Sequence, residues 1–152
     1  MDQRLKEKLK AFLKGKAVLL GIGNILKGDD GIGPELIKRL SGRVDYKLID
    51  CGTTPENYVG PIQKENPDTL ILIDCADFGA APGEIGIFEK DRIKEVGLTT
   101  HDASCKLLME VLSETIPSIF MIAIQPGSTQ FGESLSAEAE EALRKLEEIL
   151  TQ

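Results

Sequence analysis

The chain has 152 residues, of which 41% are hydrophobic and 28% charged, and its formal net charge at pH 7 is -7. This balance is typical of one globular domain with a buried core, and it argues against disorder. An acidic chain with 5% aromatic residues and no tryptophan is unsuited to nucleic acids, which need clustered basic side chains and aromatic rings. No apolar run is as long as a transmembrane helix, so no integral membrane segment is expected.

The three cysteines, Cys51, Cys75 and Cys105, include no Cys-x-x-Cys pair. An odd number without such a pair predicts neither a disulfide framework nor a structural zinc site. Cysteines that stay reduced are typical of a reducing compartment, so we expect a cytoplasmic protein.

Residues 1–16 form a basic segment that differs from the rest of the chain. They contain six basic and two acidic residues, a charge of +4, which leaves -11 on residues 17–152. Their apolar side chains recur at the spacing of one helix face, and the apolar run is too short for a signal peptide. We expect an N-terminal amphipathic helix packed on a domain of residues 17–152. Contact with a membrane surface or an acidic partner is the alternative.

Strand-like and helix-like segments alternate along the chain. Short apolar runs predict strands at residues 17–21, 44–51, 69–75, 85–90 and 118–124. Helical patterns and capping signals predict helices at residues 34–40, at 55–66 with a kink or split at Pro61, from Thr99 or Thr100 to Glu114, and at 137–150.

This alternation predicts an α/β fold, a single-domain three-layer sandwich with a twisted, mostly parallel five-stranded sheet and helices on both faces. Residues 69–75 are almost all apolar, which indicates a strand buried on both faces, whereas the alternating residues 85–90 suit a sheet edge. Ligands of such sheets bind beyond the carboxyl ends of the strands, where we therefore look for the chemistry.

A glycine-rich loop, residues 21–33, follows the first strand and contains the adjacent acids Asp29 and Asp30. A dinucleotide-binding loop would have glycine in place of Leu26, and two carboxylates would repel a pyrophosphate. A nucleotide-binding domain, with Asp50 on the ribose, is therefore a weaker alternative. Neighbouring anions need a positive charge nearby. One acid is suited to cap the helix near Pro34, and the other to bind a cation.

Two further polar residues follow later strands. Asp74 ends the third strand, where capping of the next turn is the alternative role. His101, the single histidine, is predicted just inside a helix N-terminus, which favours the neutral imidazole that binds metals; a structural histidine is the alternative. Two carboxylates and an imidazole suit zinc, nickel or iron and leave positions open for water or substrate. Cys105, four residues after His101, is either a fourth ligand or a buried apolar residue.

Five motifs, in this order, resemble the maturation endopeptidases of nickel-iron hydrogenases, most closely the branch that serves hydrogenase 3. The motifs are GIGNILKGDDGIGP at 21–34, DCGTTPEN at 50–57, DCADFG at 74–79 with APGE at 81–84, TTH at 99–101 and IQPG at 124–127. The resemblance spans residues 17–150 and implies a twisted five-stranded sheet between helices. The basic N-terminal helix is a departure, because family members begin almost directly with the first strand.

The resemblance implies an aspartyl-type endopeptidase that removes the C-terminal extension of a hydrogenase large-subunit precursor after nickel insertion. The residues of the family that contact the metal and carry the catalysis fall on Asp30, Asp74 and His101. Asp30 matches because the ligand of the family is the second acid of the pair, and Asp74 because it directly follows the apolar strand. Nickel is expected to arrive within the precursor, so the isolated enzyme need not retain it. The partner is then a protein, and a monomeric enzyme is expected.

The residues leave the mechanism open. A metal would polarise the scissile carbonyl or activate water, or a carboxylate would act as general base. Asn24, Thr53 and Gln125, in the other matching loops, would either orient the peptide or make turn hydrogen bonds. The main alternative function is a non-proteolytic nickel carrier that uses the same three ligands.

Overall fold

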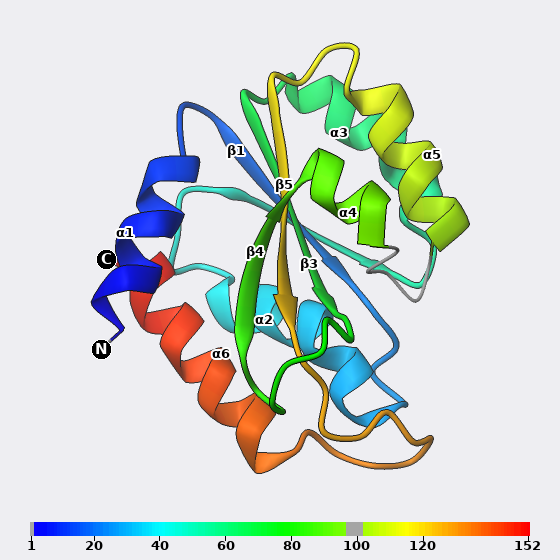
Figure 1. Ribbon diagram of the computed structural model, residues 1–152. Helices are drawn as coiled ribbons and strands as arrows, with labels where there is room; N and C mark the ends of the chain where they lie inside the picture. Colours follow the sequence, from blue (N-terminus) through cyan, green and yellow to red (C-terminus); the bar gives the residue numbers. More distant parts are fainter. Residues whose placement is uncertain (1, 97–101) are drawn as a thin grey trace.

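The computed structural model describes residues 2–96 and 102–152, which form one five-stranded sheet between two layers of helices (Figure 1). The strand order is β2-β1-β3-β5-β4, and β4 alone runs antiparallel to its neighbour in this sheet. The strands are β1 (Ala17–Ile22), β2 (Lys47–Gly52), β3 (Thr69–Cys75), β4 (Ile85–Glu89) and β5 (Ser118–Ile124). The predicted three-layer α/β fold is therefore confirmed, with β4 at the edge.

The helices divide between the two faces of the sheet. The helices and 3-10 turns are α1 (Gln3–Phe12), η1 (Gly28–Gly31), α2 (Ile32–Leu40), η2 (Pro55–Tyr58), α3 (Val59–Glu65), α4 (Lys90–Val96), α5 (Asp102–Leu112) and α6 (Ala137–Leu150). Apolar side chains of α1, α2 and α6 pack on one face, and those of η2, α3, α4 and α5 on the other. No helix in the described part of the chain is long and apolar enough to cross a membrane.

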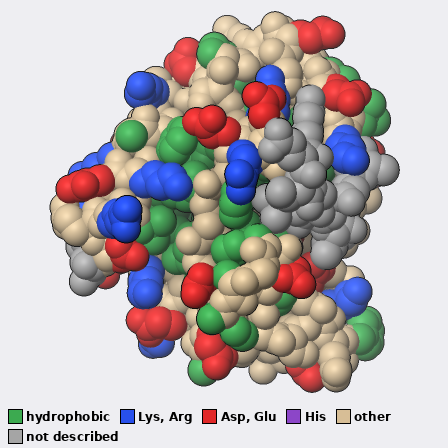
Figure 2. Space-filling view, viewed as in Figure 1, with side chains coloured by type: hydrophobic (Ala, Val, Ile, Leu, Met, Phe, Trp, Pro, Cys, Tyr) green, Lys and Arg blue, Asp and Glu red, His purple; other side chains and the backbone are tan. Residues whose placement is uncertain are grey.

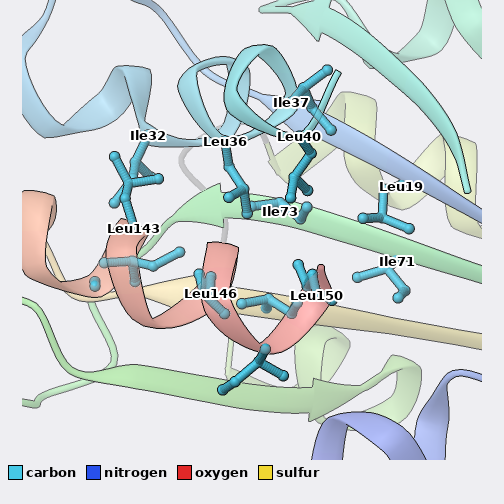
Figure 3. Close-up of a cluster of buried hydrophobic side chains, with 14 of the residues drawn as sticks. Leu19, Ile32, Leu36, Ile37, Leu40, Ile71, Ile73, Leu143, Leu146 and Leu150 are labelled. Atoms are coloured by element: carbon cyan, nitrogen blue, oxygen red, sulfur yellow. The ribbon is translucent and has the colours of Figure 1, made fainter. Parts of the chain in front are cut away.

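The central strands β3 and β5 form the middle of the core. Every residue of β3 is buried, and its register pairs Thr69 with Ser118 and Cys75 with Ile124. Alternate residues therefore enter the two apolar clusters, so that Ile71 faces α2 and α6 while Leu72 faces the opposite layer. Figure 3 shows the first cluster, in which leucines of α2 and α6 meet over β1 and β3.

The N-terminal helix α1 packs on the same core, which is the expected arrangement for its apolar face. The Asp2 carboxylate accepts a hydrogen bond from the Leu5 N–H (3.1 Å) and caps the helix. Leu9 is fully buried, and the ring of Phe12 lies 4.7 Å from that of Phe120 on β5, centroid to centroid. The helix thus covers β5 beside α6.

Several boundaries differ from the prediction by one to three residues. The predicted split of the helix at 55–66 is found, with α3 beginning two residues before Pro61, and α2 begins at Ile32, two residues before Pro34. Both prolines lie in the first turn of a helix, where a backbone N–H has no intrahelical partner, so the N–H that proline lacks costs no hydrogen bond. Strand β2 begins at Lys47, later than expected. Helix α4 was not predicted, because its charged sequence has little apolar periodicity, although Ile93 is buried.

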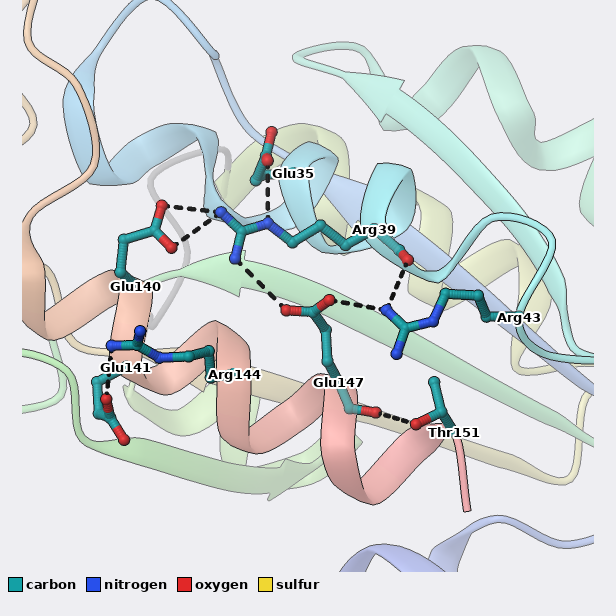
Figure 4. A network of polar contacts seen from close by, with 8 residues as sticks. All are labelled: Glu35, Arg39, Arg43, Glu140, Glu141, Arg144, Glu147 and Thr151. Carbon is teal, nitrogen blue, oxygen red and sulfur yellow. Dashed lines mark hydrogen bonds and ion pairs between the residues drawn. The ribbon is translucent and has the colours of Figure 1, made fainter.

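An ion-pair network joins α2 to α6 (Figure 4). The Arg39 guanidinium contacts Glu35 (3.0 Å), Glu140 (2.8 Å) and Glu147 (3.4 Å), and Arg43 also contacts Glu147 (2.9 Å). The hydrogen bond that Arg39 donates to the Glu140 carboxylate is the largest cause that raises the pKa of Arg39. Because exposed pairs contribute only about 0.2–1 kcal/mol each, the network mainly fixes the mutual position of the two helices.

Candidate active site

Two glycines let α2 lie directly on the sheet. A Cβ atom at Gly33 would lie 2.4 Å from the carbonyl oxygens of both Ile22 and Ile73, and one at Gly21 would lie 2.6 Å from the Gly33 carbonyl oxygen. These contacts leave no room for a side chain, since real Cβ atoms do not approach that closely. The close packing brings η1 to the carboxyl ends of β1 and β3. Asp30, a residue of η1, is thereby placed near Asp74 at the end of β3.

Asp29 is a structural residue that holds the facing loop. Its carboxylate is 1% exposed and accepts hydrogen bonds from the Gly127 N–H (2.7 Å), the Ser136 N–H (2.7 Å) and the Ser136 hydroxyl (2.8 Å). Ser136 in turn caps α6 by accepting from the Ala139 N–H. Asp29 therefore ties η1 to the loop between β5 and α6. The expectation that one acid of the pair caps α2 is wrong, because Gly31 is the N-cap and no side chain caps this helix.

Asp30 and Asp74 form a buried acid pair at this edge. Asp30 is 6% exposed, and its Oδ2 accepts a hydrogen bond from the Asn24 N–H (2.9 Å). Asp74 is fully buried, and its Oδ1 accepts from the Cys75 N–H (2.8 Å). Its Oδ2 is buried without a hydrogen-bond partner among the residues that the structure describes. Such an oxygen is costly to bury, which is typical of a position that takes a proton or a cation.

The electrostatics of Asp74 reflect this pairing. Burial, and after it the negative charge of Asp30, raise the pKa of the Asp74 carboxyl well above its ordinary value, while the Cys75 N–H lowers it. A pair of buried carboxyls, in which one oxygen of Asp74 has no hydrogen-bond partner among the described residues, can share a proton, bind a divalent cation or polarise a water molecule.

The third residue of the predicted set, His101, lies outside the described residues. The structure therefore places two members of the set, Asp30 and Asp74, side by side and leaves the third undescribed. Within residues 2–96 and 102–152, no three His, Cys, Asp or Glu side chains are arranged to hold a metal ion. Cys105 is fully buried in the apolar cluster beneath α5, as expected of a small apolar residue.

The remaining polar residues of the edge hold turns. Gln125 accepts from the Phe78 N–H (2.9 Å) and the Ala80 N–H (3.2 Å), and it donates to Asp77 (3.0 Å). That hydrogen bond, followed by one from Gly79, lowers the pKa of Asp77. Asp77 is thus an exposed acid that orders the loop after β3.

Asn24 has a similar role. Its side-chain oxygen accepts from the Leu26 N–H (2.9 Å) within its own loop. The turn interpretation therefore accounts for the contacts of Asn24 and Gln125, whereas Thr53 is exposed.

The buried cysteines at the strand ends are poor nucleophiles. Burial raises the pKa of Cys51 to about 12, and burial followed by the charge of Asp74 also raises the pKa of Cys75. A thiol with a raised pKa is protonated at neutral pH, and the thiolate is the reactive form. The acid pair is therefore the better candidate for the chemistry.

A groove of about 620 Å³ begins near this edge and runs between α1, β4 and α6. Its wall at Pro82–Ile85 is connected to the edge by a hydrogen bond from the Gly83 N–H to the Gln125 carbonyl oxygen (2.8 Å). Neither Asp30 nor Asp74 lines it. Figure 2 shows acidic and basic side chains interspersed on this face. The electrostatic potential of the face therefore does not have the single sign that would indicate a site for a charged ligand.

Comparison with known proteins identifies a family. The model of the family described as HycI, hydrogenase maturation protease, matches residues 32–152. The hydrogenase 3 maturation protease of Escherichia coli strain K12 is 37% identical over 117 residues, which cover 75% of this chain and 75% of that protein.

Solved structures agree with the sequence comparison. The [NiFe] hydrogenase maturation protease HycI of Thermococcus kodakarensis KOD1 is 31% identical with a TM-score of 0.84, over 99% of this chain and all of that one. The endopeptidase HycI of Escherichia coli is 29% identical with a TM-score of 0.78, over 90% and 89% of the two chains. Coverage of 99% means that the first of these alignments also reaches into α1.

Proposed function

This chain belongs to the hydrogenase maturation protease family, and from this premise we propose that it removes the C-terminal extension of a nickel-iron hydrogenase large-subunit precursor. The observation that carries the proposal is the buried pair of Asp30 and Asp74 at the carboxyl edge of the sheet, with one Asp74 oxygen unpartnered in the described residues. A peptidase needs such a group in contact with the scissile bond or its water.

In this proposal the acid pair recognises nickel that the precursor already contains. Two buried carboxyls repel each other, and a divalent cation between them would offset that repulsion. An open set of two carboxylates, which His101 would complete, suits a cation that arrives with other ligands of its own. Cleavage would then follow only after nickel insertion, because the precursor without metal presents no cation to the two acids.

The aspartyl character of the enzyme is part of the same proposal. One carboxylate of the pair would accept a proton from the attacking water and pass it to the nitrogen of the leaving peptide. The raised pKa of Asp74 favours that residue for this role. Cation assistance would lower the barrier further by polarising the scissile carbonyl.

We further propose that the enzyme acts as a monomer in the cytoplasm. None of the three cysteines, all of which the structure describes, is in a disulfide bond. Reduced cysteines support a reducing compartment.

The test is incubation with a nickel-loaded large-subunit precursor, followed by mass measurement of the precursor. We expect loss of a C-terminal peptide with the wild-type protein and none with Asp30→Asn or Asp74→Asn. The matched control is Asp77→Asn, a change of an exposed acid at the same edge that keeps an acceptor oxygen for Gly79 and Gln125. This control should cleave at the wild-type rate.

Two results would contradict the proposal. One is an intact precursor after incubation with wild-type protein while nickel is shown to be present. If the protein then binds nickel tightly in calorimetry, the carrier alternative explains it better. The other is normal cleavage by Asp30→Asn and Asp74→Asn, which would place the chemistry elsewhere.

A further inference from the structure

Two loops at the carboxyl edge present large apolar side chains to solvent. Ile25 is 69% and Leu26 56% exposed in the loop after β1, and Phe131 is 76% exposed in the loop after β5. Four large apolar side chains are this exposed among the described residues, and the fourth, Leu107, lies on α5. We call Ile25, Leu26 and Phe131 the apolar platform. Clustering of exposed apolar groups is typical of an interaction site.

The backbone beneath the apolar platform is ordered by contacts between the two loops. The Gly132 N–H donates to the Leu26 carbonyl oxygen (2.7 Å), and the Gly28 N–H donates to that of Glu133 (3.1 Å). The buried carboxylate of Asp29 joins the same loops from below. Figure 1 shows the two loops side by side beyond the ends of β1 and β5. Loops that are already ordered lose little entropy when a partner binds, so their exposed side chains can serve as anchors.

The apolar platform is continuous with the acid pair. The loop that presents Leu26 returns to Asp30 through a hydrogen bond from the Asp30 N–H to the Lys27 carbonyl oxygen (3.0 Å), and Asp30 accepts from Asn24 in the same loop. Leu26 and Asp30 thus belong to one hydrogen-bonded loop, so a substrate that reaches Asp30 would pass close to it.

The shape of the apolar platform indicates which part of a substrate it contacts. Its side chains project from loop tips and line neither the 620 Å³ groove nor the 240 Å³ cavity near Phe12. An extended peptide is held in a groove or along a strand, whereas projecting side chains enter hollows in a folded partner. The occupant is thus a folded surface rather than the flexible extension.

We propose that the apolar platform docks into an apolar hollow on the folded body of the large-subunit precursor, beside the bond that is cut. This inference rests on the proposed function, because it names a second contact with the same substrate. The platform contributes to binding of the precursor and not to the bond-breaking step, since its side chains point into solvent.

The experiment compares Leu26→Ser and Phe131→Ser with the control Leu107→Ser, an apolar position on α5 whose exposure is close to that of Leu26. Cleavage of nickel-loaded precursor is followed at several precursor concentrations, to separate KM from kcat. Each platform variant should raise KM about tenfold or more and leave kcat unchanged, as expected for loss of an interface anchor. Leu107→Ser should change neither constant. Phe131→Leu, which keeps an apolar side chain, should have a KM much closer to the wild-type value than that of Phe131→Ser. Thermal unfolding checks that all variants are folded.

The possible outcomes separate the two proposals. If the wild-type protein cleaves and the platform variants keep the wild-type KM, the docking inference is wrong while the proposed function stands. If the wild-type protein does not cleave, calorimetric binding of the precursor to wild-type and variant proteins still tests docking. If the same variants abolish a dimer of this chain in sedimentation and leave KM unchanged, the platform serves self-association, and the inference is overturned.

Discussion

Neighbouring carboxylates with opposite roles predict opposite effects of the same chemical change. In Asp29→Asn, one oxygen of a fully engaged carboxylate becomes an amide whose N–H groups face the donors of Gly127 and Ser136. In Asp30→Asn, the remaining oxygen can still accept from the Asn24 N–H, and repulsion of Asp74 decreases. We expect the first variant to be destabilised, and the second to be stable but inactive.

The size of the first effect follows from the hydrogen bonds. Asp29 accepts three bonds of 2.7–2.8 Å while 1% exposed, and a bond to a charged group contributes about 1.5–3 kcal/mol. Because such bonds are not additive, the free energy of unfolding should fall by about 3–5 kcal/mol, as when a buried ion pair loses a partner. This is a large part of a total of about 5–15 kcal/mol. The melting temperature should fall by roughly 6–20 °C.

Circular dichroism during chemical and thermal denaturation measures the stabilities, and precursor cleavage is assayed at a temperature where both variants are folded. Two results would refute the reasoning. If Asp29→Asn is as stable as the wild type, its hydrogen bonds do not hold the loop. If Asp30→Asn loses as much stability as Asp29→Asn, the division of the pair into a structural and a functional acid is wrong.

Three further predictions concern the frame of the site. Asp74→Asn should raise stability at neutral pH by about 1–3 kcal/mol, because the raised pKa means that Asp74 contributes most stability below its ordinary pKa and loses that contribution as the pH rises through the raised one; the difference in melting temperature between the variant and the wild type should therefore grow with pH, because the titration of the other acids is common to both proteins. Gly33→Ala should abolish cleavage and lower the melting temperature by several degrees, since its Cβ would meet two carbonyl oxygens, whereas Gly60→Ala, with open space, should do neither. Arg39→Ala should lower stability by about 1–2 kcal/mol, with the loss reduced in high salt, and urea denaturation at two salt concentrations tests this.

Most of the fold was predictable because its strands are short apolar runs with clear ends. The residues of β3 and β5 matched the prediction at both ends, since uninterrupted apolar sequence between polar turns has few alternatives. Helix α4 was missed because one buried residue, Ile93, holds it to the core and such a contact leaves no periodicity in the sequence.

The candidate site was predictable as a location and less so in its details. The rule that ligands lie at the carboxyl ends of parallel strands led to the pair Asp29 and Asp30 and to Asp74, and the family resemblance then selected Asp30. The structure brings Asp30 and Asp74 to one edge. The partners of Asp29 lie 98 to 107 residues away in the sequence, so no local pattern could have revealed its role. A serine before a helical run does indicate the N-cap at Ser136, but not what else that serine binds.

The layer formed by α2 and α6 is clamped at both ends of the two helices. Asp29 joins their N-terminal loops, and Arg39 and Arg43 join the helices further along. Neither helix can therefore swing away without breaking contacts at two separate points. A substrate that binds at this edge therefore contacts a rigid layer of α2 and α6. Any conformational change needed for binding has to occur in the substrate or in the helical layer on the opposite face of the sheet.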